Sequence, residues 1–374
     1  MIKELKIIDL YSGVGGLSLG GVKAGFNLVG AVEHEKRIID SHAVNFPKSN
    51  HLCTDISSLN GKDLSKKIKI KAIDIAGIVG GPPCQGFSTM GKRSVTDERN
   101  LLFNKFFQIV SEINPAFFIA ENVPGILDEK YLKIRKKAFG IVESNFDMLA
   151  PIKVSANDFG AATTRTRIFF IGIRKDITGG DLISDSLEKM KSKKLTFVKD
   201  ALKGLPDKID ESWLDFASSW QKLDSLSPNS YTKYINEMVE GIGDLKAIKR
   251  FLNKKEVSGC FGTRHTKVVA TRYKNLNPGE QDFISKSQKL KNNGFCPTLR
   301  AGTDSSKGSF QAVRPIHPLE SRVITPREAA RLQGFPDWFQ FHETKWHSFR
   351  QIGNSVCPIV SEKVFLAVRN SLKL

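Results

Sequence analysis

The stretch Leu5-Lys-Ile-Ile-Asp-Leu-Tyr-Ser-Gly-Val-Gly-Gly-Leu17 joins a short apolar run to a glycine-rich turn. The run Leu5–Leu10 predicts a strand, and the segment Leu17–Ala24 after the turn predicts a helix. A glycine-rich turn between a strand and a helix is typical of α/β sheets that bind nucleotide-like ligands. A turn of this kind also occurs where it serves packing alone. By itself it therefore supports the fold class and does not establish a ligand.

Short apolar runs and amphipathic segments continue to alternate as far as about residue 174. The further predicted strands are Leu28–Glu33, Ile73–Gly80, Ala116–Glu121 and Ile168–Ile173, and the further predicted helices are Lys36–Asn45 and Leu101–Ile113. This alternation predicts an α/β fold with a mostly parallel sheet and helices on both faces. Ligands of such sheets bind at the carboxyl ends of the strands. The residues that fall there, and that we expect at one edge, are Tyr11, Glu33, Cys84 and Glu121.

Composition divides the chain into three segments. Residues 1–174 carry the alternation, whereas residues 175–320 are polar and rich in Lys, Ser and Asn, with scattered aromatic residues. Residues 321–374 return to helical patterning, which begins at Thr325-Pro-Arg-Glu with a hydroxyl cap and a proline at the first helical position. We therefore expect a large discontinuous domain made of 1–174 and 321–374, and a smaller domain at 175–320.

The 374-residue chain has 57 Lys and Arg against 39 Asp and Glu, a formal net charge of +18. Such an excess favours a polyanionic partner, either nucleic acid or an anionic membrane surface. No apolar run reaches the roughly 18 residues of a membrane span, and no secretory signal pattern is seen, so we expect no membrane partner and a cytoplasmic location. The five cysteines are odd in number and lack CxxC spacing, which suits a reducing compartment and predicts no metal.

Cys84 stands in the turn Gly80-Gly-Pro-Pro-Cys-Gln-Gly-Phe-Ser88, directly after a predicted strand. The prolines restrict the backbone before the thiol, and the glycines leave room beside it. An arbitrary lone cysteine is usually buried and inert. A thiol fixed at a strand end by a turn of this kind is instead a candidate nucleophile.

An ordered set of segments over nearly the whole chain resembles the DNA (cytosine-5) methyltransferase family. The segments are Asp9-Leu-Tyr-Ser-Gly-Val-Gly-Gly16, Glu33, Asp55-Ile56, the Cys84 turn, Arg99-Asn-Leu-Leu102, Glu121-Asn-Val-Pro124, Arg165-Thr-Arg167, Thr325-Pro-Arg-Glu-Ala-Ala-Arg-Leu-Gln-Gly-Phe-Pro-Asp337 and Gln351-Ile-Gly-Asn-Ser-Val356. The resemblance implies a Rossmann-like, S-adenosyl-L-methionine-dependent methyltransferase of the bacterial restriction-modification type. It also implies that 1–174 and 321–374 form the catalytic domain and that 175–320 form the target-recognition domain.

The resemblance places S-adenosyl-L-methionine around the glycine turn. Tyr11 would lie against the ligand, and Glu33 would accept hydrogen bonds from the ribose hydroxyls. Asp55 would bind the adenine amino group, with Ile56 as an apolar neighbour. The other residues expected to line or close the pocket are Ser12, Gly13, Gly15, Gly16, His34, Pro83, Leu102, Asn354, Ser355 and Val356. Because family members often carry an aromatic residue where His34 stands, we expect adenine stacking there to be weaker or supplied differently.

The implied chemistry begins with attack of the Cys84 thiolate on C6 of cytosine, because C5 alone is a poor nucleophile. Glu121, at the end of an apolar strand, would share a proton with N3. Arg165 and Arg167 would favour the thiolate, and we expect them on opposite faces of a strand, with Arg167 at the base and Arg165 supporting Glu121 or the backbone. Thr163 stands where the family usually has glutamine, which leaves that supporting role open. The target base must leave the duplex to be reached.

Duplex DNA is the expected partner of an enzyme with these motifs. Segment 245–275 holds nine basic residues against Glu256 alone, a pattern that suits phosphate contact, although a solvated surface also explains it. The residues expected to touch DNA are Gln85, Ser88, Lys254, Lys255, Arg264 and Arg272. We expect a monomer associated with the nucleoid through DNA. A solitary methyltransferase and one paired with a cognate restriction endonuclease, which would act on the same site without a stable complex, would carry the same motifs.

Three other functions fit part of the pattern. A tRNA cytosine-5 methyltransferase would share the motifs, but the 146 residues of 175–320 favour a reader of duplex DNA. A non-catalytic DNA-binding protein would be expected to lack the nucleophile or the acid, and this chain keeps both. A nucleotide-dependent oxidoreductase would explain the glycine turn and leave the other segments without a role.

Overall fold

The computed structural model describes residues 4–83, 99–209, 219–223, 228–301 and 313–372. Its main sheet has eight strands, in the order β3-β2-β1-β4-β5-β8-β6, with β7 also paired to β8. The strands are β1 (Lys6–Leu10), β2 (Asn27–Glu33), β3 (Asn50–Cys53), β4 (Ile75–Gly80), β5 (Phe117–Asn122), β6 (Phe146–Met148), β7 (Ile152–Ser155) and β8 (Thr166–Arg174). The first five run parallel, whereas β8 is antiparallel to β5, β6 and β7. The predicted α/β fold with a mostly parallel sheet is confirmed.

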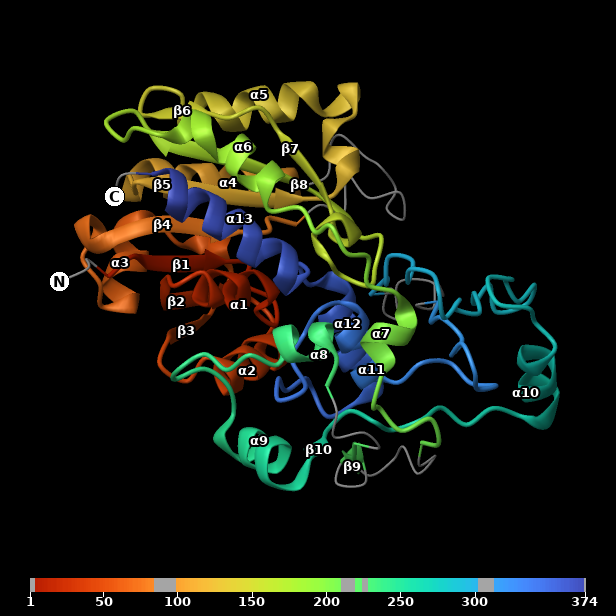
Figure 1. Ribbon diagram of the computed structural model, residues 1–374. Coiled ribbons are helices and arrows are strands. Elements are labelled where there is room, and N and C mark those ends of the chain that lie inside the picture. Colours follow the sequence, from red (N-terminus) through yellow and green to blue (C-terminus); the bar gives the residue numbers. More distant parts are fainter. Residues whose placement is uncertain (1–3, 84–98, 210–218, 224–227, 302–312, 373–374) are drawn as a thin grey trace.

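Helices cover both faces of this sheet (Figure 1). They are α1 (Gly16–Lys23), α2 (Lys36–Asn45), α3 (Gly61–Ile68), α4 (Arg99–Ile113), α5 (Leu132–Gly140), α6 (Ile183–Lys189), α7 (Val198–Leu202), α8 (Ser230–Ile235), α9 (Leu245–Lys249), α10 (Lys267–Lys274), α11 (Pro326–Leu332), α12 (Lys345–Asn354) and α13 (Pro358–Ser371). Short strands β9 (Gln221–Lys222) and β10 (Glu256–Val257) pair separately. None of the helices in the described ranges is long and apolar enough to cross a membrane.

Two apolar clusters follow from the alternation of side chains along each strand. Ile7 and Phe117 belong to the cluster that α1 and α13 cover, while their neighbours Ile8 and Phe118 belong to the cluster that α4 covers. In the second cluster the ring of Phe107 packs edge-on against Phe118, with centroids 5.5 Å apart. Such an aromatic pair adds about 0.5–1.5 kcal/mol beyond the area it buries. The sheet is therefore buried on both faces, as parallel sheets require.

The end of the chain returns to its beginning, because α13 lies beside α1 over the sheet (Figure 1). Ser361 Oγ donates to the Gly16 carbonyl at 2.8 Å, and Arg369 donates to the Ala24 carbonyl at 2.7 Å. A side chain on Gly20 would overlap Ser361, so this glycine permits the close approach of the two helices. The carboxy-terminal segment thus packs directly on the glycine turn.

The segment 175–320 extends to one side of the sheet, with α10 at its far end (Figure 1). It has a small apolar cluster around Val257, and a second around Tyr273 that also includes Val323. It also contributes to the main core: α6 packs on α13, and Cys296 and Leu299 belong to the cluster that contains α1. Residues from this segment therefore lie within the large domain, and the boundaries at 174 and 320 stay a prediction.

Candidate active site

The glycine turn after β1 is held by contacts with β2 and with the carboxy-terminal segment. Ser12 N–H donates to the Val32 carbonyl at 3.0 Å. A side chain on Gly16 would overlap Ser355 Oγ and the Val356 carbonyl, so this glycine lets the predicted turn 354–356 dock against residues 11–16. Two parts of the predicted pocket that are about 340 residues apart in sequence therefore meet, although Asn354 itself is exposed.

The turn leaves open space where a ligand is expected. Gly13 has φ +55°, and a side chain built on it would meet nothing within 4 Å. Ser12 Oγ is buried and has no hydrogen-bond partner among the residues described. An open glycine face beside an orphaned hydroxyl fits a polar ligand held close to the backbone.

Glu33 lies at the end of β2 and faces the glycine turn. Its Oε2 accepts from Gly13 N–H at 3.2 Å, and its Oε1 accepts from the backbone of His34 and Glu35 at 2.9 and 3.1 Å. Burial acts to raise the pKa of Glu33, but the hydrogen bond from His34 Nδ1 and those backbone N–H groups lower it overall. The carboxylate is thus ionised and fixed, with acceptor capacity left for hydroxyl groups.

The opposite wall of the pocket is apolar. The Tyr11 hydroxyl donates to the Leu102 carbonyl at 2.7 Å, which joins the glycine turn to α4. Ile56 is buried in the second apolar cluster, and Tyr11 and Leu102 pack against that cluster. Burial and then the charge of Asp55 raise the pKa of Tyr11, so the phenol stays neutral. These residues come together as the resemblance implies.

Asp55 and His34 stand at the exposed rim. Asp55 Oδ1 accepts from Ser57 N–H at 2.9 Å and caps the short 3-10 turn Ile56–Ser58, which lowers the pKa of the carboxyl. The His34 side chain is 73% exposed, and its hydrogen bond to Glu33 raises its pKa. His34 therefore orients Glu33, a role that its place in the sequence did not predict.

Glu121 lies at the end of β5, beside the turn that leads to Cys84. A side chain on Gly81 would lie 3.1 Å from Glu121 Oε2, so the carboxylate faces that turn. Asn122 Nδ2 donates to the Pro82 carbonyl at 3.3 Å and ties β5 to the same turn, before half-buried Pro83. The predicted residues Cys84, Gln85 and Ser88 lie outside the described residues.

Arg167 forms an ion pair with Glu121, with 2.7 Å between Arg167 Nε and Glu121 Oε1. Their side chains are only 14% and 11% exposed, so little solvent screens the pair. The expectation that Arg165 and Arg167 lie on opposite faces of a strand is wrong. Residues two apart on a strand share a face, and the two side chains diverge because Arg165 precedes β8. The ion pair makes Arg167 a support of Glu121, the role that was expected of Arg165.

Arg165 leads to a part of the site that sequence reasoning missed. Its guanidinium donates to the Leu299 carbonyl at 3.3 Å, and Thr164 N–H donates to the Cys296 carbonyl at 3.0 Å. On the other side of this segment, a side chain on Gly353 would clash with the backbone of Arg300 and Ala301. Residues 296–301 therefore run between Arg165 and α12. Thr163, in place of the usual glutamine, is buried beside Cys296.

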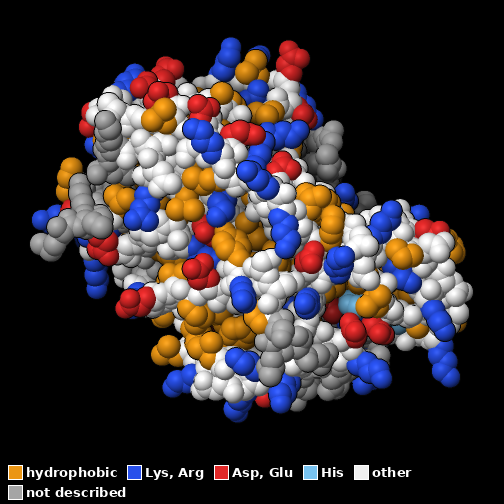
Figure 2. All heavy atoms as spheres, viewed as in Figure 1, with side chains coloured by type: hydrophobic (Ala, Val, Ile, Leu, Met, Phe, Trp, Pro, Cys, Tyr) orange, Lys and Arg blue, Asp and Glu red, His pale blue; other side chains and the backbone are white. Residues whose placement is uncertain are grey.

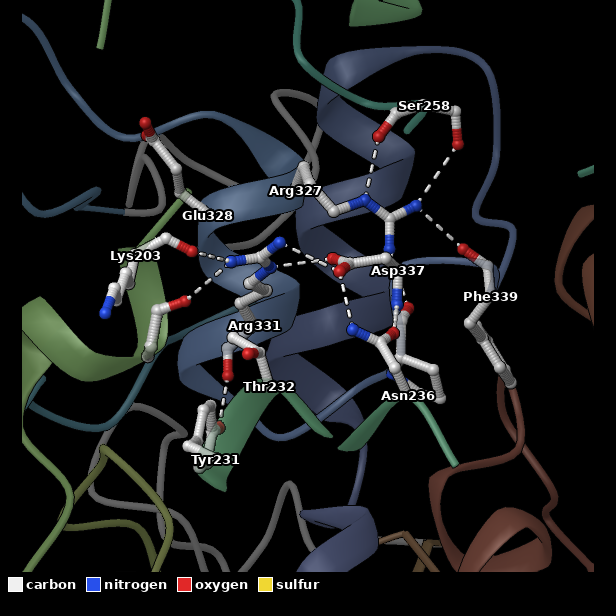
Figure 3. Close-up of polar contacts among 12 residues, drawn as sticks. Lys203, Tyr231, Thr232, Asn236, Ser258, Arg327, Glu328, Arg331, Asp337 and Phe339 are labelled. Atoms are coloured by element: carbon white, nitrogen blue, oxygen red, sulfur yellow. Dashed lines mark hydrogen bonds and ion pairs between the residues drawn. The ribbon is translucent and has the colours of Figure 1, made fainter. Parts of the chain in front are cut away.

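A buried polar network joins the segment 175–320 to α11 (Figure 3). Arg331 binds Asp337 through two hydrogen bonds of 2.7 and 2.8 Å, and Arg327 donates to the Phe339 carbonyl at 2.8 Å. Burial acts to raise the pKa of Asp337, but the charge of Arg331 holds it below its usual value. The partners in 175–320 are Ala201, Lys203, Asn236 and Ser258. The stretch Thr325–Asp337 thus fixes how the two parts of the chain meet.

The predicted DNA-contacting residues of 245–275 do not form one patch. Lys254 and Lys255 are exposed at the end of the helical turn after α9, and Arg264 is exposed before α10. Arg272 binds the buried carboxylate of Asp282 at 2.5 and 3.2 Å, so its charge is already compensated. Lys and Arg side chains are spread over the whole visible face (Figure 2), and net charge alone does not locate the DNA.

Comparison with known proteins places this site in a family. The C-5 cytosine-specific DNA methylase family matches residues 5–370, and the chain belongs to that family. It is therefore a DNA cytosine-5 methyltransferase, as the resemblance implied. The type II methyltransferase M.XorII of Xanthomonas oryzae pv. oryzae is 36% identical over 98% of this chain and 85% of its own length. M.DdeI of Desulfomicrobium norvegicum is 31% identical over 96% and 87%.

Solved structures agree with the fold. A protein of an E. coli prophage described as a DNA modification methyltransferase is 48% identical, with a TM-score of 0.88 over 98% of this chain and 99% of that one. The Dnmt2 methyltransferase of S. pombe has a TM-score of 0.63 at 17% identity over 98% and 99%, which shows the shared fold alone.

Proposed function

We propose that the chain transfers a methyl group from S-adenosyl-L-methionine to C5 of a cytosine flipped out of duplex DNA, through a covalent bond between Cys84 and C6. The observation that carries this proposal is the Glu121–Arg167 pair, held against the turn that leads to Cys84. Cytosine C5 is a weak nucleophile, and a thiol alone does not activate it. An acid that serves N3 must stand beside the nucleophile, and the Glu121 carboxylate faces Gly81 in the turn that leads to Cys84.

Attack forms the bond between Cys84 sulfur and C6 and moves the C5–C6 electron pair towards C5. Glu121 shares a proton with N3 as negative charge builds on the ring, and Arg167 keeps the carboxylate directed at the base. C5 would take the methyl group as the methyl–sulfur bond of the sulfonium breaks, with the electron pair of that bond left on sulfur as a thioether. C5 then loses its proton to water. The electron pair of that C–H bond re-forms the double bond and expels the Cys84 thiolate.

S-adenosyl-L-methionine fits the space beside the glycine turn. The ligand would supply an electrophilic methyl group on sulfur. Glu33 would accept from the ribose hydroxyls, and Asp55 would accept from the adenine amino group. Ile56 and Leu102 would contact the ring, since the Ile56 cluster borders the turn. The cofactor contains no phosphate, which agrees with a turn that carries a carboxylate rather than a cation.

The biological role proposed is protection of host DNA in a type II restriction-modification system, since M.XorII and M.DdeI are named type II methyltransferases. The enzyme would act as a monomer on DNA in the bacterial cytoplasm. A cognate endonuclease would recognise the same site without forming a stable complex. Choice of the site would reside in 175–320, which α11 holds in place through Arg327 and Arg331.

Mapping of methylated bases tests the proposal. The chain is expressed in cells that lack cytosine methylation, and their DNA is sequenced after bisulfite conversion. We expect protected cytosines within one short sequence, and incorporation of labelled methyl groups into duplex DNA but not into tRNA. Labelling of tRNA alone, or of adenine, would contradict the proposal.

A further inference from the structure

Arg314 is a cation that the proposed mechanism does not use. Its guanidinium lies over the ring of Phe349 of α12, with Cζ 4.3 Å from the centroid. Its Nε is buried, and no hydrogen-bond partner for that atom is found among the described residues. Arg322 and Arg331 have the carboxylate partners Glu328 and Asp337, and the buried Arg327 donates to carbonyl groups and to Ser258. For the Arg314 guanidinium, the described residues show the contact with Phe349.

A second cation lies close to Arg314. Lys345 begins α12, and its Nζ donates to the Gly262 carbonyl and to Thr263 Oγ1, the latter at 3.0 Å. Burial and then the charge of Arg314 lower the pKa of Lys345 to about 8, and burial lowers the pKa of Arg314 to about 10. Two partly desolvated positive charges and a hydroxyl group thus meet at one place. An anion bound by Arg314 would offset the desolvation of its guanidinium.

The place itself lies between the segment 175–320 and the cofactor turn. Lys345 and Phe349 are four residues apart and share one face of α12. The same helix reaches Gly353, where residues 300–301 cross it, and then Ser355, which contacts Gly16. From Lys345 to Gly353 the helix rises about 12 Å. A ligand bound at the start of α12 is therefore slightly more than two helical turns from residues that border the active site.

We infer that Arg314 and Lys345, with the Thr263 hydroxyl, bind a backbone phosphate of the substrate DNA. A phosphate matches the donor geometry of a guanidinium and tolerates an ammonium beside it. The Phe349 ring contacts the guanidinium, with Cζ 4.3 Å from the ring centroid, and a guanidinium stacked on a ring can still donate to an anion from its edge. The cofactor has no phosphate, so it does not account for this cation pair. The inference rests on the proposed function only in taking duplex DNA as the substrate.

Salt dependence of DNA binding tests this inference. Arg314→Met keeps an apolar chain on Phe349 and removes the charge, whereas Arg314→Lys keeps the charge. Binding of a labelled mixed-sequence duplex is measured by fluorescence anisotropy between about 50 and 250 mM salt. For Arg314→Met we expect a slope of log Kd against log salt shallower by about 0.9, and affinity lower by about eightfold at 0.1 M. Arg314→Lys is expected to keep the wild-type slope.

Three controls separate the possible outcomes. Lys189→Met removes one charge from an exposed position of α6, outside the set Arg314, Lys345 and Thr263, and is expected to leave the slope unchanged. Lys345→Gln is a second route to the same shallower slope if Arg314→Met is unstable. Cofactor affinity is expected to stay at the wild-type value in all variants. An unchanged slope in both Arg314→Met and Lys345→Gln would overturn the inference.

A further experiment distinguishes a DNA phosphate from free phosphate as the ligand of this site. Inorganic phosphate at constant ionic strength is expected to shift the melting temperature of wild type and Arg314→Met equally. Stabilisation by phosphate that depends on Arg314, with no change in the DNA slope, would mean that the site takes a free anion instead. If the wild-type chain bound no duplex at all, the proposed function would fail together with this inference.

Discussion

Arg167 Nε lies 2.7 Å from Glu121 Oε1, and the two residues come from neighbouring antiparallel strands. The pair closes the edge of the sheet where the turn towards Cys84 begins, because Gly81 lies against the other carboxylate oxygen. A carboxylate fixed in this way faces the turn that leads to Cys84. The proposed chemistry depends on this placement more than on any property of the carboxylate alone.

Replacement of Glu121 by Gln keeps the shape of the side chain and removes its ability to share a proton with N3. We expect the rate of methyl transfer to fall by about 10²–10⁴-fold, the usual contribution of a positioned acid or base. Cofactor affinity is expected to change little. Single-turnover transfer of a labelled methyl group, together with calorimetry of cofactor binding, measures both. A loss confined to cofactor binding would show that Glu121 belongs to the other pocket.

Unlike Glu121→Gln, Glu33→Ala is expected to act on cofactor binding. It removes an ionised acceptor that three backbone N–H groups hold in place, and we expect cofactor binding to weaken by about 1–3 kcal/mol. DNA affinity without cofactor is expected to stay unchanged. Calorimetry on Glu33→Ala and on Asp63→Ala, a carboxylate on α3 outside the pocket, makes the comparison. Equal cofactor affinities in the two variants would refute the pocket.

Asp9 gives the fold a dependence on pH. Burial raises its pKa to about 7, the charges of Glu33 and Glu121 act in the same direction, and the hydrogen bond from Ser18 opposes them. The folded chain therefore holds a proton that the unfolded chain releases near pH 4. The stability that this proton provides is complete below about pH 4 and is lost as the pH rises to about 7.

Asp9→Asn keeps an acceptor for the Ser18 hydroxyl and cannot titrate. We expect the free energy of unfolding of this variant, relative to wild type, to increase steadily between pH 5 and pH 7. Urea unfolding at several pH values measures the difference. His42, whose pKa burial lowers, contributes a slope of the opposite sign to both proteins and cancels in the comparison. A difference that does not vary with pH would contradict the assignment.

The fold was predictable because its signals are local. The apolar alternation gave the bounds of α2, and the capping box of Thr325 and Glu328 marked the start of α11. The cofactor pocket could be predicted only from the family resemblance, since no local sequence pattern relates Gly16 to Ser355. The segment 296–301 gave no signal at all, because its contacts with Arg165 and Gly353 join positions far apart in sequence. Non-local packing of this kind leaves no periodicity to detect.

Lys254 and Lys255 remain predicted DNA contacts. Replacing both by Ala is expected to weaken binding almost equally for all duplexes and to reduce the salt slope by up to about 1.8, because two phosphate contacts are lost. Lys66 and Lys67, an exposed pair on α3, provide the matched control and are expected to have no effect on the slope. Relaxed site choice in the Lys254/Lys255 variant would instead assign these residues to base reading.

The bond proposed between Cys84 and C6 of the target cytosine can be trapped as a covalent complex. In a duplex whose target carries 5-fluorocytosine, C5 has no proton to lose, so the Cys84 thiolate is not expelled and the adduct persists. We expect wild-type protein, DNA and cofactor to give a complex that survives denaturation, with the nucleotide mapped to Cys84 by peptide mass spectrometry. Cys84→Ser is expected to give no complex and no methylation while it still binds DNA. An adduct at another residue, or turnover by Cys84→Ser within tenfold of wild type, would contradict the account.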